Sequence, residues 1–324
     1  MSKKKNQKHH PLSILIVAVL AVVAYFFFPQ EADPQNHSKP ETESSAPAPG
    51  VGDVRHSLCT SLSSQAQAYY TGEYSFDTLS GLKGSKDAPM DSPLFDALHN
   101  LMTDTMTDSV TYRSLTKYFP ETDCTNGSEN ASLIYSDSVS SDSYSREHVW
   151  PKSKASFHIK DGGCDIHHLR PENTAVNSTR RNYIFGNVRG VLKDYKTDQY
   201  EGRDVLYYSS TENRVELNDN VKGDVARILL YVYVRWEEPN LYMDVENPVT
   251  GPEEEDINTG ERVIESLDTL LQWCQEDPVD QWEMVRNDKC QDIQGNRNVF
   301  IDYPELAWLL FGKEVPASMP TPTA

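Results

Sequence analysis

The chain has 324 residues and a net charge of −19, with 38% hydrophobic and 10% aromatic residues. This composition supplies ample material for a packed core and excludes a disordered body. The length allows one large mixed domain once a leader and a linker are set aside. The charge argues against binding of a polyanion by the chain as a whole, because like charges repel.

A basic window interrupts this acidic average. Between Arg146 and Lys193, nine cationic side chains stand against four anionic ones, so the window carries a net charge of +5 and the remainder −24. Charge alone favours ordinary surface variation over a basic cleft. A functional interpretation of the window therefore needs support from its motifs.

The first 29 residues have the pattern of an export signal. Lysines at positions 3, 4, 5 and 8 precede an apolar run of 17 residues, Leu12 to Phe28, that only Ser13 interrupts. The run is at the lower edge of the roughly 17–25 residues that span a bilayer, and no small-x-small cleavage site follows it. We therefore expect residues 1–29 to be a signal anchor, with a cleaved signal peptide as the alternative. The protein is expected outside the cytoplasm, anchored through this helix or secreted.

Composition divides the rest of the chain into three parts. Residues 30–52 are rich in Pro, Ser and Glu, which predicts an extended linker without a core. Residues 53–314 are expected to form a single folded domain. Residues 315–324 contain three more prolines and are expected to be a disordered tail.

Short β-like segments bounded by Asp, Gly, Ser or Asn predict strands in the middle of the chain. These segments lie around Ile134 and at 144–149, 188–192 and 205–208. Between the second and third of these segments, Pro171 suits the first turn of a helix that we expect at about 172–183.

Three helices are predicted toward the C-terminus, two of them from apolar residues at helical spacing. The apolar faces of these two consist of Val225, Ile228, Leu229, Val232 and Trp236, then Val263, Leu267, Leu270, Leu271 and Cys274. The third helix is expected to have Asp277 as N-cap and Pro278 in its first turn, and to end near Gly295. Its Trp282 and Val285 should face inward. The predicted class is mixed α+β.

Five cysteines are too few and too scattered for a disulfide scaffold, and no CxxC pair occurs. The odd number leaves at least one thiol unpaired. In an exported domain, Cys274 and Cys290 are the first pair to test for a bridge, because they would lie near the facing ends of neighbouring helices.

A carboxylate stands directly beside a histidine in the segment 145–153. Adjacent residues of a strand point to opposite faces. A metal-binding Glu147 and a water-activating His148 would therefore converge only if the chain bends or pairs irregularly there. Alone, such a pair is weak evidence for a site.

A second polar cluster follows it. In a helix at 172–183, four polar side chains would share one face, because they are spaced by three or four residues. They are Asn173, Asn177, Arg180 and Arg181, and Asp165, His167 and His168 precede them. A solvated helix side usually explains such a face, but it does not explain two clusters so rich in His, Asp and Asn.

Three motifs follow one another along this stretch: Arg146-Glu147-His148-Val149-Trp150-Pro151, Asp165-x-His167-His168-Leu169-x-Pro171 and Asn177-x-x-Arg180-x-Asn182. In this order they resemble the endonuclease I family of the ββα-metal, or His-Me finger, nucleases. Further matches occur at 80–84, 97–100, 222–227 and 294–298. The resemblance thus spans about residues 69–308.

The resemblance implies an α+β fold with a ββα-metal core embedded in a mainly helical single domain. It implies His148 as general base with Arg180 as a second catalytic residue, and Glu147 and Asn177 as protein ligands of one divalent cation. The supporting residues would be Arg146, Asp165, His167, His168 and Asn182. A neutral imidazole accepts a proton from water near neutral pH, and carboxylate and amide oxygens suit Mg²⁺, with Ca²⁺ or Mn²⁺ as substitutes.

The chain departs from the family pattern in two places. Periplasmic members resemble it but carry a longer insertion with a phosphate-facing arginine, whereas His148 and Asp165 are here only 17 residues apart. The candidates for that arginine's role are Lys152, Lys154, Lys160, Arg170 and Arg181. The partner that orients His148 is also unassigned, because Gly162, Gly163 and Cys164 stand where some relatives have an acidic group.

On this basis we expect an exported, metal-dependent endonuclease that hydrolyses DNA, and also RNA, to 5′-phosphate and 3′-hydroxyl ends. Its partners would be nucleic acid and, through the N-terminal segment, the membrane; no protein partner can be deduced. One alternative is a zinc-dependent hydrolase that uses His158, Cys164, His167 and His168. The other is a non-catalytic, membrane-tethered nucleic-acid-binding module.

Overall fold

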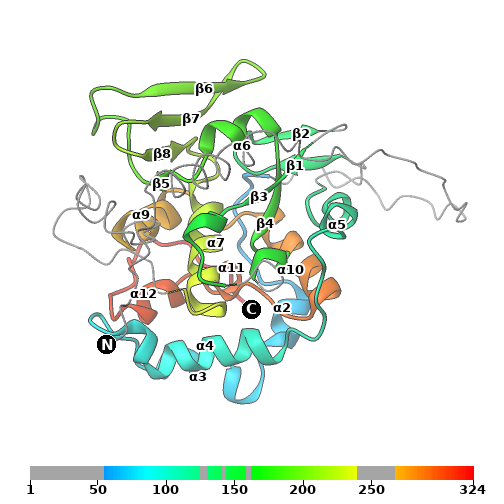
Figure 1. The fold of residues 1–324 in the computed structure, drawn as a ribbon. Coiled ribbons are helices and arrows are strands. Elements are labelled where there is room, and N and C mark those ends of the chain that lie inside the picture. Colours follow the sequence, from blue (N-terminus) through cyan, green and yellow to red (C-terminus); the bar gives the residue numbers. More distant parts are fainter. Residues whose placement is uncertain (1–54, 125–129, 141–143, 158–161, 239–266) are drawn as a thin grey trace, which may run out of the picture. The chain divides into compact units, whose positions relative to one another are not determined.

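The computed structural model describes residues 55–124, 130–140, 144–157, 162–238 and 267–324, which combine helices with three small sheets (Figure 1). The mixed α+β class expected from the sequence is confirmed. The predicted leader and linker lie outside the described residues. Within the described ranges, no helix has the length and hydropathy needed to cross a bilayer.

The N-terminal part of the domain is helical. Its elements are α2 (Ser64–Tyr69), η1 (Gly72–Tyr74), α3 (Phe76–Gly81), η2 (Pro89–Asp91), α4 (Pro93–Asp104) and α5 (Leu115–Thr122). Serine side chains begin several of these helices by accepting a hydrogen bond from the first turn, as Ser92 does from the backbone N–H of Phe95. Pro93 follows at the first helical position, where its missing N–H costs nothing.

Strands dominate the middle of the chain. Two antiparallel pairs, β1 (Ala131–Leu133) with β2 (Ser138–Ser140) and β3 (Ser145–His148) with β4 (Leu169–Glu172), precede a four-stranded sheet. That sheet has the order β5 (Ile184–Phe185), β8 (Arg214–Leu217), β7 (Arg203–Ser209) and β6 (Lys196–Tyr200). The short helix α6 (Thr174–Arg180) joins β4 to β5 and packs on β6 and β7. Two 3-10 turns, η3 (Lys152–Lys154) and η4 (Gly162–Cys164), lie between β3 and β4.

Two of the predicted segments between residues 170 and 195 are corrected by the structure. The expected strand at 188–192 is a turn, in which the backbone N–H groups of Val188 and Arg189 bond to the Glu216 carboxylate. The expected helix at 172–183 is shorter, because Pro171 belongs to β4 and Asn173 is the N-cap of α6.

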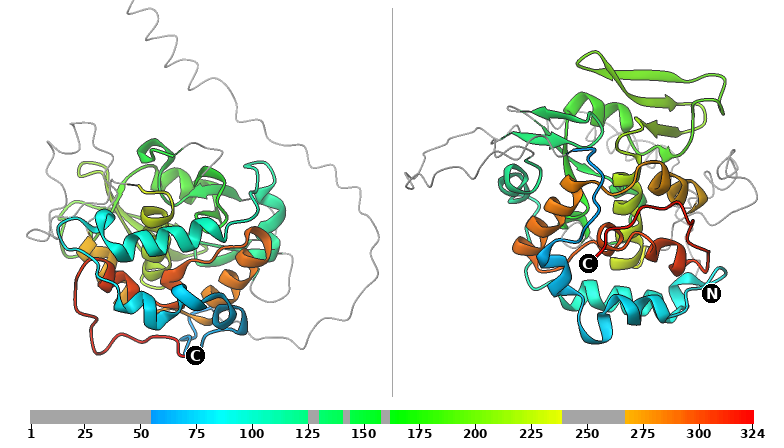
Figure 2. Two further views of the ribbon diagram at one scale, coloured as in Figure 1. Left: turned by 90° about the horizontal axis from the view of Figure 1, so that it is seen from below. Right: turned by 180° about the vertical axis from the view of Figure 1, so that it is seen from behind.

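Helix α7 (Lys222–Arg235) is the central element, and α4, α9 and α11 pack against it (Figures 1 and 2). All of its residues are buried, so the predicted apolar face is confirmed for Val225, Ile228, Leu229 and Val232, and the opposite face is covered as well. Trp236, predicted on the same face, is instead the half-buried C-cap. The remaining helices are α9 (Leu267–Glu276), α10 (Gln281–Gln294), α11 (Val299–Asp302) and α12 (Leu306–Leu310). Val263, which was expected to extend the apolar face of α9, lies outside the described residues.

The start of α10 differs from the sequence expectation. Asp280, rather than Asp277, is the N-cap, because Glu283 completes a capping box with it. Gly295, with φ of 96°, ends the helix as predicted. Trp282 is buried as expected, but Val285 is 46% exposed and does not face inward.

The expected Cys274–Cys290 bridge is not formed, because both residues have free thiols. Cys274 packs in the main core around α7, whereas Cys290 belongs to a second cluster with Phe119 and Ile166. The two thiols therefore serve as small apolar groups in different parts of the interior.

The C-terminal residues 315–324 are ordered, and the expectation of a disordered tail is wrong. The carbonyl of Thr323 accepts a hydrogen bond from Leu62 N–H, and Thr323 N–H donates to the carbonyl of Thr60. Met319 is buried in the main core. Proline fixes φ at about −65°, which is compatible with an extended segment, and this segment forms a single parallel bridge between Thr323 and Ser61.

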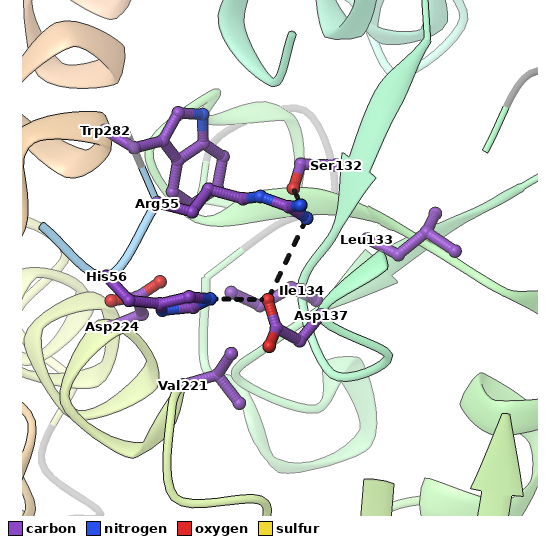
Figure 3. Close-up of a pocket in the computed structure, with 9 residues that line it drawn as sticks. All are labelled: Arg55, His56, Ser132, Leu133, Ile134, Asp137, Val221, Asp224 and Trp282. Atoms are coloured by element: carbon purple, nitrogen blue, oxygen red, sulfur yellow. Dashed lines mark hydrogen bonds and ion pairs between the residues drawn. The ribbon is translucent and has the colours of Figure 1, made fainter. Parts of the chain in front are cut away.

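Arg55 and His56 close a small cavity beside the turn between β1 and β2 and the start of α10 (Figure 3). His56 Nε2 lies 2.9 Å from Asp137 Oδ1, and His56 N–H donates to Asp280 Oδ2 at 2.7 Å. The cavity has a volume of about 10 Å³, which holds at most one water molecule. The cavity is therefore too small for a ligand, and the residues around it have a structural role.

The His56–Asp137 pair makes stability depend on pH. The hydrogen bond to Asp137 raises the pKa of His56, against the effect of burial, so this contribution is present below about pH 6.5 and is lost as pH rises through the folded pKa. We expect His56→Gln to lower the unfolding free energy at about pH 5.5 by less than about 1 kcal/mol, as for a half-exposed pair, and to have no effect at about pH 8.5. Urea unfolding of both proteins at the two pH values measures this; an equal loss at both would show that the charge of His56 is not involved.

Candidate active site

The hairpin of β3 and β4 arranges the predicted site residues on two faces. Its register is regular, with Glu147 opposite Arg170 and His148 opposite Leu169. Side chains therefore alternate, and Ser145 and Glu147 face α6 while His148 faces away from it. The chain does not bend to bring Glu147 and His148 to the same face.

Glu147 is buried on the α6 side and surrounded by donors. The hydroxyl of Tyr135 donates to its Oε1 at 2.7 Å, and Arg180 Nε lies 3.5 Å away. The Asn177 amide is close enough to lower the pKa of the carboxyl. Burial raises the pKa of Glu147 to about 7, although Arg180, Tyr135 and Asn177 act in the opposite direction. A bound cation would favour the charged carboxylate here.

Asn177 is brought to Glu147 by α6. The N-cap Asn173 accepts hydrogen bonds from Ala175 and Val176 N–H and so sets the start of this helix. One turn later, Asn177 Nδ2 donates to Ser145 Oγ at 2.8 Å, on the same face of β3 as Glu147. The two predicted metal ligands are thus adjacent in space, 30 residues apart in sequence.

His148 lies on the other face, between aromatic rings. Tyr112 stacks on it with ring centroids 5.5 Å apart and an interplanar angle of 22°, and His168 contacts it edge-on. Its Nε2 is buried and has no partner among the described residues, while the backbone of Gly163 is hydrogen bonded to the ring. Burial, followed by the neighbouring His168, lowers the pKa of His148 to about 3, so the imidazole is neutral.

The backbone of Gly163 is a candidate for the group that orients the ring of His148, which the sequence left unassigned. A carbonyl that accepts from the ring raises the pKa of an imidazole, as this contact does. Because Nε2 has no partner among the described residues, we assign the ring hydrogen to Nδ1 and the lone pair to Nε2. No acidic side chain is needed at residues 162–164. Sequence reasoning missed this partner because a backbone carbonyl has no residue signature.

Asp165 and His167 lie behind the hairpin and brace it. Asp165 accepts hydrogen bonds from Tyr231 Oη at 2.7 Å, Gln294 Nε2 at 2.9 Å and Trp236 Nε1 at 3.0 Å. Although burial opposes its ionisation, His167 and these bonds hold the pKa of Asp165 below its usual value. The carboxylate of Asp165 therefore has a structural role: it links the segment before β4 to α7 and α10.

His168 and His167 are both engaged with the backbone. Trp150 N–H donates to His168 Nε2 at 2.9 Å, and His168 Nδ1 lies 2.8 Å from the Gly162 carbonyl. His167 Nε2 lies 3.0 Å from the Asn296 carbonyl. In the part of the chain that the structure describes, no three His, Cys, Asp or Glu side chains are placed to share a metal, and His158 lies outside that part.

The other predicted residues surround the hairpin in different settings. Arg180 is buried, its guanidinium donates to the Val149 and Arg181 carbonyls, and it stacks 4.3 Å from the Phe185 ring. Arg146 donates to the Tyr112 carbonyl and lies 3.9 Å over that ring. Asn182 is exposed and donates to Ser153 Oγ.

Two tyrosines of this site had no signal in the sequence. Tyr135 follows β1 and Tyr112 precedes α5, and neither belongs to a motif or to a periodic pattern with the hairpin. Glu172 positions Tyr135 by accepting the N–H groups of Tyr135 and Ser136 and the Ser136 hydroxyl. Its carboxylate also accepts from Asn173 N–H, so it ties the turn after β1 to the start of α6.

Burial and pairing exclude some of the side chains that were candidates for contacting the substrate phosphate. Arg170 is buried and its Nε donates to Asp123 Oδ1 at 2.7 Å, so it does not reach a substrate. Lys160 lies outside the described residues. Lys152 and Arg181 are exposed and Lys154 is half-buried, and these three remain.

Comparison with known proteins agrees with the family suggested by the motifs. The sequence pattern of the endonuclease I family matches residues 96–305. An extracellular ribonuclease of Bacillus amyloliquefaciens is 42% identical over 167 residues, which cover 51% of this chain and 52% of that protein. A periplasmic deoxyribonuclease of Aeromonas hydrophila is 29% identical over 150 residues, which cover 46% and 50%. The chain thus spans about half the length of these curated relatives. Because the family pattern matches well over half of its residues, the chain belongs to the endonuclease I family.

Proposed function

We propose that this protein is an extracytoplasmic, divalent-metal-dependent endonuclease that hydrolyses phosphodiester bonds of both DNA and RNA. The observation that carries the proposal is the pairing of Glu147 with Asn177 on one face of β3 and a neutral His148 on the other. The names of the relatives, one a ribonuclease and one a deoxyribonuclease, support the lack of sugar specificity. Their extracellular and periplasmic names support export.

The residues around Glu147 fit a hard divalent cation. The donor set is one carboxylate and one carboxamide, which suits Mg²⁺, Ca²⁺ or Mn²⁺ rather than zinc. Glu147 and Asn177 would hold the ion, and Tyr135 would orient the Glu147 carboxylate through its hydroxyl. The ion would supply stabilisation of negative charge on the phosphate and on the departing 3′ oxygen.

His148 is suited to act as the general base. Its Nε2 lone pair accepts a proton from a water molecule, and the Gly163 carbonyl keeps the hydrogen of the neutral ring on Nδ1. Attack of this water on phosphorus with loss of the 3′ oxygen leaves 5′-phosphate and 3′-hydroxyl ends. Arg180 would act as a positioning residue, because its guanidinium joins the end of β3 to the end of α6.

Although Glu147 and His148 lie on opposite faces of β3, both could reach one phosphate that lies at the edge of this strand. Among the described residues, β3 pairs only with β4, so its other edge is free of backbone partners. A phosphate that lies along this edge would meet Glu147 on one side and His148 on the other. We propose this edge as the position of the cleaved bond.

Metal titration separates the roles of the two neighbours. His148→Ala should lose activity by roughly 10²–10⁴-fold and should not recover with added Mg²⁺, because the missing step is proton transfer. Glu147→Ala and Asn177→Ala should lose metal affinity, so part of their activity should return at high Mg²⁺. Initial rates against Mg²⁺ concentration, on plasmid and on RNA, measure this, with the exposed carboxylate variant Glu73→Ala as control. Recovery of His148→Ala by Mg²⁺ would exclude His148 as the base.

Tyr135→Phe tests the orientation of Glu147 by its hydroxyl. Loss of a group that orients a metal ligand typically weakens metal binding by about 10–100-fold, so the Mg²⁺ concentration for half-maximal activity should rise within that range. The maximal rate should be restored at saturating Mg²⁺. Tyr70→Phe is the matched control, because its hydroxyl also donates to a buried carboxylate, that of Asp302. An unchanged Mg²⁺ requirement in Tyr135→Phe would remove Tyr135 from the metal site.

A further inference from the structure

A groove of about 270 Å³ opens where the end of α6 meets β6 and β7. Its lining includes Arg181 and Tyr183 after α6, Lys196 of β6 and Tyr208 of β7. Helix α6 packs on both strands (Figure 1). The side chains that line the groove therefore come from neighbouring elements. None of the residues that line it takes part in the chemistry assigned above.

The groove is basic in an otherwise acidic protein. Arg181 and Lys196 are both exposed, and its described lining contains no Asp or Glu. Neither cation forms an ion pair with a described residue, whereas nearby Arg189 is paired with Glu216 and Asp219. Two unpaired cations in one depression suit an anion such as a phosphodiester.

One residue of the groove, Arg181, lies one helical turn from the proposed metal ligand Asn177. Arg181 follows Asn177 by four residues, and Arg181 N–H donates to the Asn177 carbonyl, so the two are one helical turn, or about 6 Å, apart. Arg181 has φ of 54° and ψ of −134°, a conformation that a residue with a side chain rarely adopts. The chain turns sharply at this point, and Arg181 lines the groove after the turn.

The groove also offers an aromatic surface. Tyr208 is half-buried and lies nearly parallel to Tyr183, with ring centroids 6.2 Å apart. Exposed aromatic rings next to cations are the usual means of holding single-stranded nucleic acid, because every base can stack on them. In a duplex the bases are paired and stacked on one another, so they are not available to Tyr208.

We propose that this groove binds the nucleotide next to the cleaved bond in an unpaired strand, with its phosphate on Arg181 and Lys196 and its base on Tyr208. The inference rests on the proposed nuclease function and adds to it a preference for single-stranded substrate. Arg181 thereby takes the place of the phosphate-facing arginine that the shorter segment between His148 and Asp165 leaves unassigned.

Binding without cleavage tests the groove. The full chain is titrated with a fluorescent 12-nucleotide single strand and with its duplex, in chelator, at several salt concentrations. Arg181→Ala and Lys196→Ala should each weaken binding of the single strand and make its salt dependence shallower by about 0.7 in the log–log slope, the value for one lost phosphate contact. Lys86→Ala, which removes an exposed lysine beyond α3 and outside the groove, is the control. Slopes for the groove variants equal to that of Lys86→Ala would overturn the phosphate contact.

The stacking contact has its own variants. Tyr208→Ala should weaken binding of the single strand by about 5- to 150-fold, the range for loss of one stacked base, and leave the duplex unchanged. Tyr195→Ala is the matched control, because Tyr195 is 41% exposed and contacts Tyr207, the neighbour that points to the opposite face of β7. Equal loss on both substrates, or none, would overturn the stacking. Since no step requires cleavage, absence of metal-dependent cleavage by the wild type in a parallel assay would count against the proposed function and not against the groove.

Discussion

The regular antiparallel register between β3 and β4 is the constraint on which the candidate site depends. Ser145 to His148 pair with Glu172 to Leu169 without a bulge, so side chains alternate strictly between two faces. Glu147 is thereby placed against α6 and His148 against Tyr112. A slip of one residue would exchange these faces and separate both groups from their partners.

Buried carboxylates hold the hairpin in place from three sides. Asp123 accepts from Arg170 of β4 and from Arg286 of α10, Asp165 accepts from α7 and α10, and Glu172 accepts from the turn after β1. Each carboxylate has several donors, because an unpaired buried charge would cost several kcal/mol. The position of the site therefore depends on contacts between residues that are 66 and 163 positions apart in the sequence.

The distribution of charge explains how an acidic protein can approach a polyanion. Many arginines are internal: Arg227 bonds to Glu283, Arg286 to Asp123 and Arg297 to Asp302. Even Arg170, within the basic window, is buried and paired, so the window overstates the positive charge available at the surface. For contact with a substrate, the exposed cations matter more than the total number of cations in the window. Arg181 is one of these exposed cations and lies one helical turn from Asn177.

Local sequence patterns are enough to predict the α+β class, most of the apolar faces of α7 and α9, a strand at 144–149 and the end of α10 at Gly295. Its motifs also predicted that Glu147 and Asn177 would meet, and they do. Which groups surround these two residues depends on contacts between distant parts of the chain. Tyr135 and the Gly163 carbonyl reach the site through long-range packing that leaves no residue spacing to detect. The same holds for the C-terminal segment. Its prolines fit a disordered tail and an extended segment equally well, and its order comes from hydrogen bonds to residues 60–62 at the other end of the described chain.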